Sequence, residues 1–87
     1  MSVIIEFSEH SMVKIELLKN HGLEISKSMI EDIIRFPDKM EKSYKDRFIA
    51  QKGLDDEHVI RIVYETIREK IRVITLYPGR RIRYEKD

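Results

Sequence analysis

The sequence predicts a single α+β domain over residues 1–87, in which two N-terminal helices pack on one face of an antiparallel sheet in the order β-α-α-β-β-β-β. Two observations indicate this fold class. Apolar residues recur at helical spacing before Pro37 and at alternate positions after it. Of the 87 residues, 41% are hydrophobic and fourteen are isoleucine, which is enough for one core near the lower size limit of a self-supporting domain.

The N-terminal half is expected to contain one strand and two helices. Val3–Phe7 reads as a short strand, and Ser8 is placed to cap a helix that stops at Gly22. Ser26 is placed to cap a second helix, and Pro37 ends it because proline cannot continue a helix. The apolar positions at helical spacing are Ile15, Leu17, Leu18, Met29, Ile30, Ile33 and Ile34.

The C-terminal half is expected to form four strands. They are Lys39–Tyr44, Asp46–Lys52, Glu57–Arg68 and Lys70–Tyr77. Hairpin connections are expected at Asp55-Asp56 and Glu69-Lys70, with a shorter turn near Lys45.

Alternation along these strands assigns two different sheet faces, because successive side chains point to opposite sides. The face expected to meet the helices carries Phe48, Ala50, Ile60, Ile62, Ile74 and Leu76. The other face mixes polar with apolar side chains: Arg47, Ile49, Gln51, Val59, Arg61, Val63, Val73, Thr75 and Tyr77. A partner-binding surface, a substrate cleft and a sheet half covered by the tail all fit such a face.

Composition excludes several classes of site. Cysteine is absent, so the chain has no disulfide, thiolate–metal site or thiol nucleophile, which fits a cytoplasmic protein. The three histidines lack metal-ligand spacing, and no glycine-rich nucleotide motif is present, so neither a metal nor a cofactor is expected. The N-terminus resembles neither a secretory signal nor a membrane span. The many Lys, Glu and Arg are typical of thermophile proteins, although an AT-rich genome also raises Ile and Lys.

Positive charge is concentrated at the C-terminal end. Residues 1–67 carry ten Lys/Arg and thirteen Asp/Glu, whereas residues 68–87 carry seven and three. The net charge of +1 therefore hides a change from −3 to +4 along the chain, which favours polyanion contact at this end. A solvated basic tail is the alternative.

His10 is the first candidate site residue. It lies in the first turn of the first helix, where the helix dipole favours a neutral imidazole that can transfer a proton. The alternative is a histidine that satisfies local backbone groups. Arg47 and Arg61, as cross-sheet neighbours, would hold a phosphodiester bidentately; the alternative is pairing with Glu65 and Glu41.

The segment "YPGRRIRY" is the second candidate. Pro78-Gly79 is expected to turn the chain after Tyr77, so that the tail folds back within reach of His10, because the first strand is expected to pair beside the last. Arg80, Arg81, Arg83 and Tyr84 follow. Arginines can neutralise a phosphorane and tyrosine can stack on a base or donate a proton, whereas the alternative is an edge strand with solvated arginines.

These residue types suit metal-free cleavage of RNA. The ribose 2′-OH supplies the nucleophile, so a protein needs only to deprotonate it, stabilise the phosphorane and protonate the leaving oxygen.

The blocks "FSEHSMVKIELLKNHGLEIS", "FPDKM", "DRFIAQK", "HVIRIVYE" and "VITLYPGRRIRY" resemble a family of small prokaryotic domains with a His-Ala start and a Tyr-Pro-x-Arg-Arg end. That family is similar in fold to the RelE/ParE toxins and their MqsR and BrnT relatives. The resemblance implies a RelE-like sheet and an RNA-cleaving toxin, active on free or ribosome-bound RNA, that a cognate antitoxin holds. The family pattern falls on six residues: His10, Arg47, Tyr77, Arg80, Arg81 and Tyr84. Ser11 replaces the small apolar residue usual after the histidine.

Three functional hypotheses follow. The first is a metal-independent, toxin-type endoribonuclease with His10, Arg47, Arg81 and Tyr84 as catalytic residues. Its RNA or phosphate contacts would be Arg61, Tyr77, Arg80 and Arg83. The second is a non-catalytic module of the same fold that binds protein or nucleic acid, and the third is a homodimer formed through an exposed strand edge.

Overall fold

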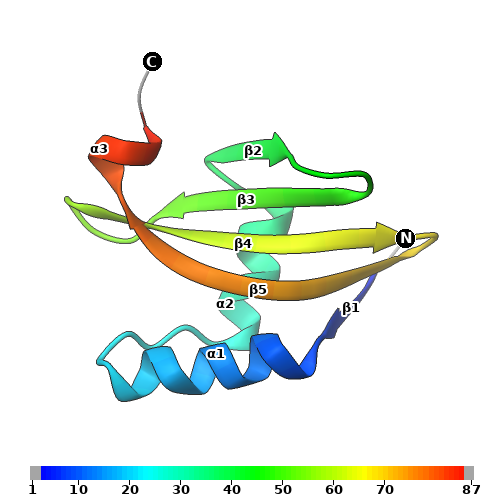
Figure 1. Ribbon diagram of the computed structural model, residues 1–87, viewed down its shortest axis with the longest axis horizontal. Coiled ribbons are helices and arrows are strands. Elements are labelled where there is room, and N and C mark those ends of the chain that lie inside the picture. The colour runs from blue at the N-terminus through cyan, green and yellow to red at the C-terminus, as the bar shows by residue number, and fades with distance from the viewer. Residues whose placement is uncertain (1–2, 86–87) are drawn as a thin grey trace.

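The strands form one five-stranded mixed sheet in the order β1-β5-β4-β3-β2, accompanied by three helices (Figure 1). The structure, a computed structural model, describes residues 3–85. The elements are β1 (Ile4–Phe7), α1 (Glu9–Asn20), α2 (Lys27–Arg35), β2 (Lys39–Lys42), β3 (Arg47–Gly53), β4 (His58–Ile67), β5 (Lys70–Arg80) and α3 (Arg81–Tyr84). The α+β class is thus confirmed, and the chain adds a short last helix to the predicted order.

The first strand makes the sheet mixed rather than antiparallel. β1 pairs beside β5, as predicted, but runs parallel to it, with Ile4 opposite Lys70 and Phe7 opposite Val73. Parallel neighbours need a long connection, and the whole chain between Phe7 and Lys70 supplies it. The other three strand pairs are antiparallel, so the prediction of a fully antiparallel sheet is wrong for β1 only.

Both predicted helix caps are confirmed. The hydroxyl of Ser26 accepts the N–H of Met29 at the start of α2. The Ser8 hydroxyl accepts the N–H of Ser11 at 3.1 Å and donates to the carbonyl of Ile74 at 3.0 Å. Ser8 therefore caps α1 and fastens the start of that helix to β5.

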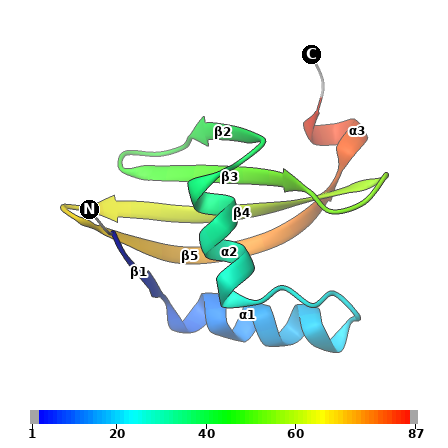
Figure 2. The same cartoon turned by 180° about the vertical axis from the view of Figure 1, so that it is seen from behind.

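The two long helices lie in different places relative to the sheet. Figure 2 shows α2 crossing one face, where it packs on β3 and β4. α1 instead lies along the edge of β5 (Figure 1), so the prediction that both helices cover one face is wrong for α1. The reason is the shortness of β1, which reaches only Val73 and leaves the outer edge of β5 beyond it to α1.

The predicted core face is largely confirmed. Ala50, Ile60, Ile62 and Leu76 are fully buried under α2, and Phe48 packs against them. Ile74 is the exception, because Tyr64 pairs with Val73 while Val63 pairs with Thr75. This bulge gives β5 one extra residue and reverses its alternation, so that Val73 takes the core position predicted for Ile74.

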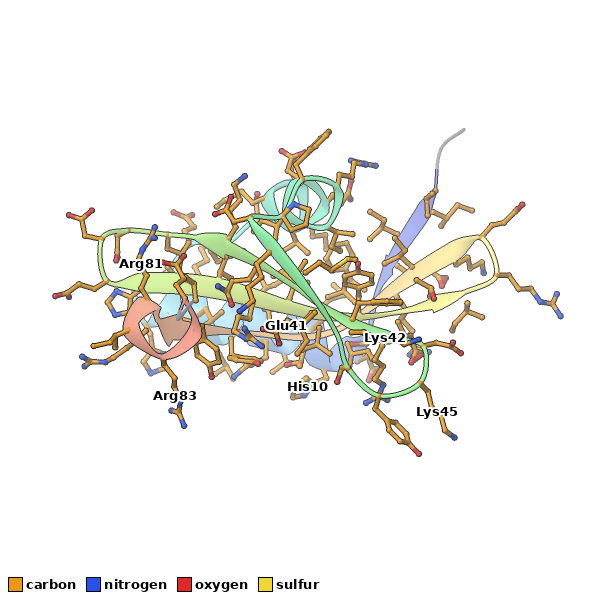
Figure 3. All side chains as sticks on the ribbon, turned by 90° about the horizontal axis from the view of Figure 1, so that it is seen from above. His10, Glu41, Lys42, Lys45, Arg81 and Arg83 are labelled. Carbon is orange, nitrogen blue, oxygen red and sulfur yellow. The ribbon has the colours of Figure 1, made fainter. Side chains whose placement is uncertain are left out.

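The end of the chain also differs from the prediction. Pro78 and Gly79 do not form a turn but continue β5, opposite Ile60 and Val59. The chain bends only after Arg80, and α3 lies at the end of the sheet near the β3–β4 hairpin (Figure 1), on the side opposite α2 (Figure 3). No helix in residues 3–85 is long and apolar enough to cross a membrane.

Candidate nucleic-acid interface on the open sheet face

The sheet face opposite α2, called the open face below, is built from rows of residues aligned across neighbouring strands. The strand registers give four rows: Glu6, Arg72, Glu65, Arg47; then Thr75, Val63, Ile49, Glu41; then Tyr77, Arg61, Gln51, Lys39; and finally Gly79, Val59, Gly53. They are called the charged, threonine, arginine and glycine rows. The predicted mixture of polar and apolar side chains on this face is confirmed, except that Val73 belongs to the core.

Arg61 lies at the centre of the arginine row and is only 4% exposed. Its guanidinium donates to the hydroxyl of Tyr77 at 3.0 Å, to the side-chain oxygen of Gln51 and to Glu41 at 3.1 Å. Burial disfavours the charged guanidinium, but the hydrogen bonds to Glu41 and Tyr77 outweigh it and raise the pKa of Arg61. The hydrogen bond from Arg61, opposed in part by burial and assisted by Lys39, lowers the pKa of Glu41. Arg61 is therefore an internal cation with its charge compensated in place.

Tyr84 covers this group from the solvent side. The Arg61 guanidinium carbon lies 4.1 Å from the centre of the Tyr84 ring, within cation–π range. The Lys39 ammonium donates to the backbone carbonyl of Tyr84 at 3.1 Å and pairs with Glu41 at 3.3 Å. The exposed Arg83 guanidinium approaches the same ring at 6.0 Å. Lys39 and Glu41 of β2 and Tyr84 of α3 therefore surround the Arg61 guanidinium on the open face.

The helix α3 packs on the glycine row. A Cβ atom at Gly79 would overlap the Tyr84 ring, and one at Gly53 would overlap the Arg81 guanidinium. Val59, between the two glycines, is fully buried. The missing side chains let α3 approach the backbone closely, and the close approach buries Val59 and Arg61.

Arg81 fixes α3 to the β3–β4 hairpin. Its Nε donates to the carbonyl of Asp55 at 2.6 Å, and its Nη1 pairs with Glu85 at 2.8 Å. The backbone N–H of Arg81 donates to the carbonyl of Glu57 at 2.9 Å. Asp55 organises the same hairpin by accepting from the N–H of Glu57 and from His58, and these bonds lower its pKa. In this structure Arg81 binds protein groups.

His10 borders the threonine row. Its Nε2 shares a hydrogen bond of 3.0 Å with the hydroxyl of Thr75, and the imidazole is exposed. Thr75 and Tyr77 are alternate residues of β5 on the same face, about 7 Å apart along the strand. His10 therefore lies one row away from the Arg61–Tyr77 hydrogen bond.

His10 and the C-terminal arginines do not share one cleft, contrary to the prediction. α1 lies beyond the β5 edge of the sheet, whereas α3 sits near the β2 side (Figure 1). Figure 3 shows His10 and Arg83 on the side opposite α2 but separated along the sheet, with Arg81 at the hairpin end. The prediction failed because the bend comes after Arg80 instead of at Pro78, which carries the tail past the threonine row.

The other predicted site residues fall in separate places. Arg47 and Arg61 are not cross-strand neighbours: Arg47 lies opposite Glu65, 3.8 Å away in an ion pair, and Arg61 lies opposite Gln51. This matches the alternative in which carboxylates pair with both arginines. Alternation assigns Arg80 to the side of Leu76, away from Tyr77. The exposed cations left on the open face are Lys39, Arg47, Arg72 and Arg83.

Sequence reasoning missed Lys39 and the two glycines of the glycine row, and it named Glu41 only as an alternative partner for the arginines. Gln51 was placed on the correct face, but nothing in its local sequence shows that it accepts from Arg61. The signal for the glycines was the presence of Gly53 and Gly79 inside strand-like segments, which indicates close approach by another part of the chain.

No group of three or more His, Asp or Glu side chains within residues 3–85 is placed to hold a metal ion. Comparison with protein-family models, with curated proteins and with solved structures finds no match to this chain.

Proposed function

We propose that the open face binds single-stranded RNA and that the protein is a metal-independent endoribonuclease of the toxin type, RelE/ParE-like, which a cognate antitoxin restrains in the cytoplasm. One observation carries the proposal: the exposed His10–Thr75 pair borders the same sheet face as Tyr77, Arg61 and Tyr84, one row away. A spacing of about 7 Å between rows is close to the distance between successive phosphates of an extended strand.

The reaction is a transesterification within the RNA. Nδ1 of His10, with Nε2 donating to the Thr75 hydroxyl, accepts the proton of a ribose 2′-OH as the ribose oxygen attacks the neighbouring phosphorus, and the bond from phosphorus to the 5′-oxygen breaks. The products are a 2′,3′-cyclic phosphate and a 5′-hydroxyl, whose proton comes from water or from a tyrosine hydroxyl. Thr75 holds the imidazole through its hydroxyl.

Phosphates along the strand would meet the exposed cations of the open face. Arg83 and Lys39 lie at the α3 end and Arg47 lies at the charged row, so the face offers cations on both sides of the threonine row. Between these cations the partly buried side chains of Ile49, Val63 and Thr75 form a surface of short side chains on which bases can lie.

A non-catalytic RNA-binding module is the second candidate, and the state of Arg61 favours it. A phosphorane needs a cation that is free to meet it, whereas Arg61 is buried and Arg81 is bonded to Asp55 and Glu85. Binding requires only the exposed cations and leaves both contacts in place.

Purified protein incubated with 5′-labelled single-stranded RNA in EDTA tests the proposal. The wild type should produce fragments ending in 2′,3′-cyclic phosphate, and His10→Ala should abolish them while RNA binding persists. His21→Ala is the matched control, because His21 is an exposed histidine at the other end of α1 and should leave cleavage unchanged. Binding without any cleavage by the wild type would select the non-catalytic module, and absence of both would reject the proposal.

A further inference from the structure

The strand β2 forms one outer edge of the sheet. Among residues 3–85 only β3 pairs with it (Figure 1). The N–H of Ser43 donates to the carbonyl of Arg47, and hydrogen-bonded pairs recur at every second residue of an antiparallel ladder, so Glu41 uses its backbone groups on β3. The N–H and carbonyl groups of Met40 and Lys42 therefore point outward, where another strand can bind them.

The side chains along this edge are exposed. They include three large apolar ones: Phe36 is 70% exposed, Met40 56% and Tyr44 68%. The two aromatic residues stand four positions before and four positions after Met40. Exposed apolar side chains beside unpaired backbone groups mark an edge at which a second strand can add to the sheet.

The charges of this edge are arranged symmetrically about Met40. In the segment "DKMEK", residues at equal distances from the methionine carry opposite charges: Asp38 with Lys42, and Lys39 with Glu41. When two copies of this segment align antiparallel about a two-fold axis at Met40, each of these residues faces its opposite charge in the second copy. Opposite charges on facing positions stabilise a strand pair. The edge is therefore complementary to itself.

The neighbouring registers bring like charges together instead. A shift of one residue places Lys39 opposite Lys42 in one direction. In the other direction it places Asp38 opposite Glu41. A shift of two residues places either Lys39 or Glu41 opposite its own copy. Like charges that face each other destabilise a strand pair, so the charges that protect this edge from other registers favour the one centred on Met40.

We infer that two copies of the protein pair through their β2 strands, antiparallel and in the register centred on Met40, and so join two five-stranded sheets into one. Met40 exchanges backbone hydrogen bonds with Met40 of the second copy. The N–H of Lys42 donates to the carbonyl of Asp38 in the second copy. The N–H of Asp38 takes no part, because it donates to the carbonyl of Gln51 at 2.9 Å within its own chain.

The pairing has a consequence for the open face. Residues that face each other on neighbouring strands lie on the same side of a sheet, so the open faces of both copies lie on one side of the joined sheet. Lys39 and Glu41 lie on that side and already form an ion pair of 3.3 Å within one chain. Across the axis the two ion pairs become a group of four alternating charges. The inference goes beyond the RNA proposal and does not depend on it.

Sedimentation velocity over a concentration series tests the inference. The wild type should show a reversible monomer–dimer equilibrium, and Met40→Glu should weaken it at least about tenfold because two carboxylates then meet at the axis. Ile4→Glu is the matched control, since Ile4 is similarly exposed (59%) but lies on β1 at the other side of the sheet. It should leave the dissociation constant unchanged. A wild type that stays monomeric, or an equal loss in Ile4→Glu, would overturn the inference.

Charge reversal tests the register. Asp38→Lys and Lys42→Glu should each weaken self-association at least about tenfold, because each brings like charges together twice. An equimolar mixture of the two variants should form a heterodimer about as tight as the wild-type dimer, because every facing pair is again of opposite charge. Asp56→Lys reverses an exposed charge in the β3–β4 hairpin and should keep wild-type self-association. A mixture that fails to associate would reject the register.

Two further results complete the design. Asp38 also accepts the N–H of Gly53 at 3.0 Å, so Met40→Glu and Lys42→Glu decide the outcome if Asp38→Lys does not fold. Wild-type association of both would overturn the inference. A dimer that neither binds nor cleaves RNA would reject the proposed function and leave this inference standing, whereas a monomer that binds RNA would do the reverse.

Discussion

The guanidinium of Arg61 lies under the ring of Tyr84, with 4.1 Å between the guanidinium carbon and the ring centre. This contact joins the last helix to the middle of the sheet. The contact buries an arginine whose charge Glu41 compensates. It also makes the C-terminal segment, for which a solvated tail was the alternative prediction, part of the folded domain. Removal of the tail would therefore expose Val59 and Arg61 together.

Gly79→Ala should destabilise the domain by about 1–3 kcal/mol, because the added methyl group overlaps the Tyr84 ring and displaces α3 from the sheet. Urea unfolding followed by circular dichroism measures the change. Ile82→Ala is the control in the same helix, since Ile82 is 79% exposed and its loss should change the free energy of unfolding by less than about 0.5 kcal/mol.

A double-mutant cycle identifies the cause of that loss. If the clash with Tyr84 is responsible, Gly79→Ala should cost much less in a Tyr84→Ala background than in the wild type. An equal cost in both backgrounds would place the effect in the strand β5 itself.

Glu41→Gln should make the free energy of unfolding less dependent on pH in the acidic range. The hydrogen bond from Arg61 lowers the pKa of Glu41 below the usual value of a glutamate, so the carboxylate stabilises the folded state fully above that usual pKa and loses its contribution as pH falls through the lowered pKa. Glu41 is 37% exposed, so solvent screening limits the effect to about 1 kcal/mol or less. The difference in free energy of unfolding between wild type and variant should shrink from pH 6 toward pH 3. A difference that is constant over that range would contradict the assigned role of the charge.

The sequence was a good guide wherever one local rule decides the structure. Ser8 and Ser26 cap helices because a short side-chain oxygen satisfies a free N–H in the next turn, and this needs no knowledge of the rest of the chain. Ala50, Ile60 and Ile62 were placed correctly because β3 and β4 keep their alternation over their whole length.

Predictions failed where distant residues decide. The bulge at Ile74 reversed the alternation of β5, and the carbonyls on either side of it are held by Ser8, sixty-six residues away. Pro78 can continue β5 because β1 pairs with β5 only as far as Val73. Beyond that residue no strand lies on this edge of β5, so the N–H that a proline lacks is not needed there. The position of His10 depends on both facts, and this is why its distance from Arg81 could not be foreseen.

Arg68→Gly should stabilise the β4–β5 hairpin by about 0.5–1 kcal/mol. Arg68 has φ 57°, in the left-handed region where side chains other than glycine are strained, and it is exposed in a two-residue turn. Glu69→Gly is the matched control in the same turn. Positive φ occurs among the non-glycine residues of 3–85 only at Lys45 and Arg68, so glycine at 69 relieves no strain and should destabilise. Thermal melting distinguishes the two, and a lower melting temperature for Arg68→Gly would show that the side chain contributes more than the strain costs.

Exposed arginines of the open face should control the salt dependence of RNA binding. The double variant Arg47→Gln/Arg83→Gln removes one cation at each end of the face, on β3 and on α3. If each contacts a phosphate, the slope of log affinity against log salt should fall by about 1.4, since each phosphate contact with a single strand contributes about 0.7. Filter binding of an oligouridine at several salt concentrations measures the slope. Lys27→Gln/Arg35→Gln removes the same charge from α2 and should leave the slope unchanged, because α2 lies on the other face. Equal decreases of the slope for both pairs would mean that RNA binding responds to the total charge of the protein. That result would reject the open face as the binding surface.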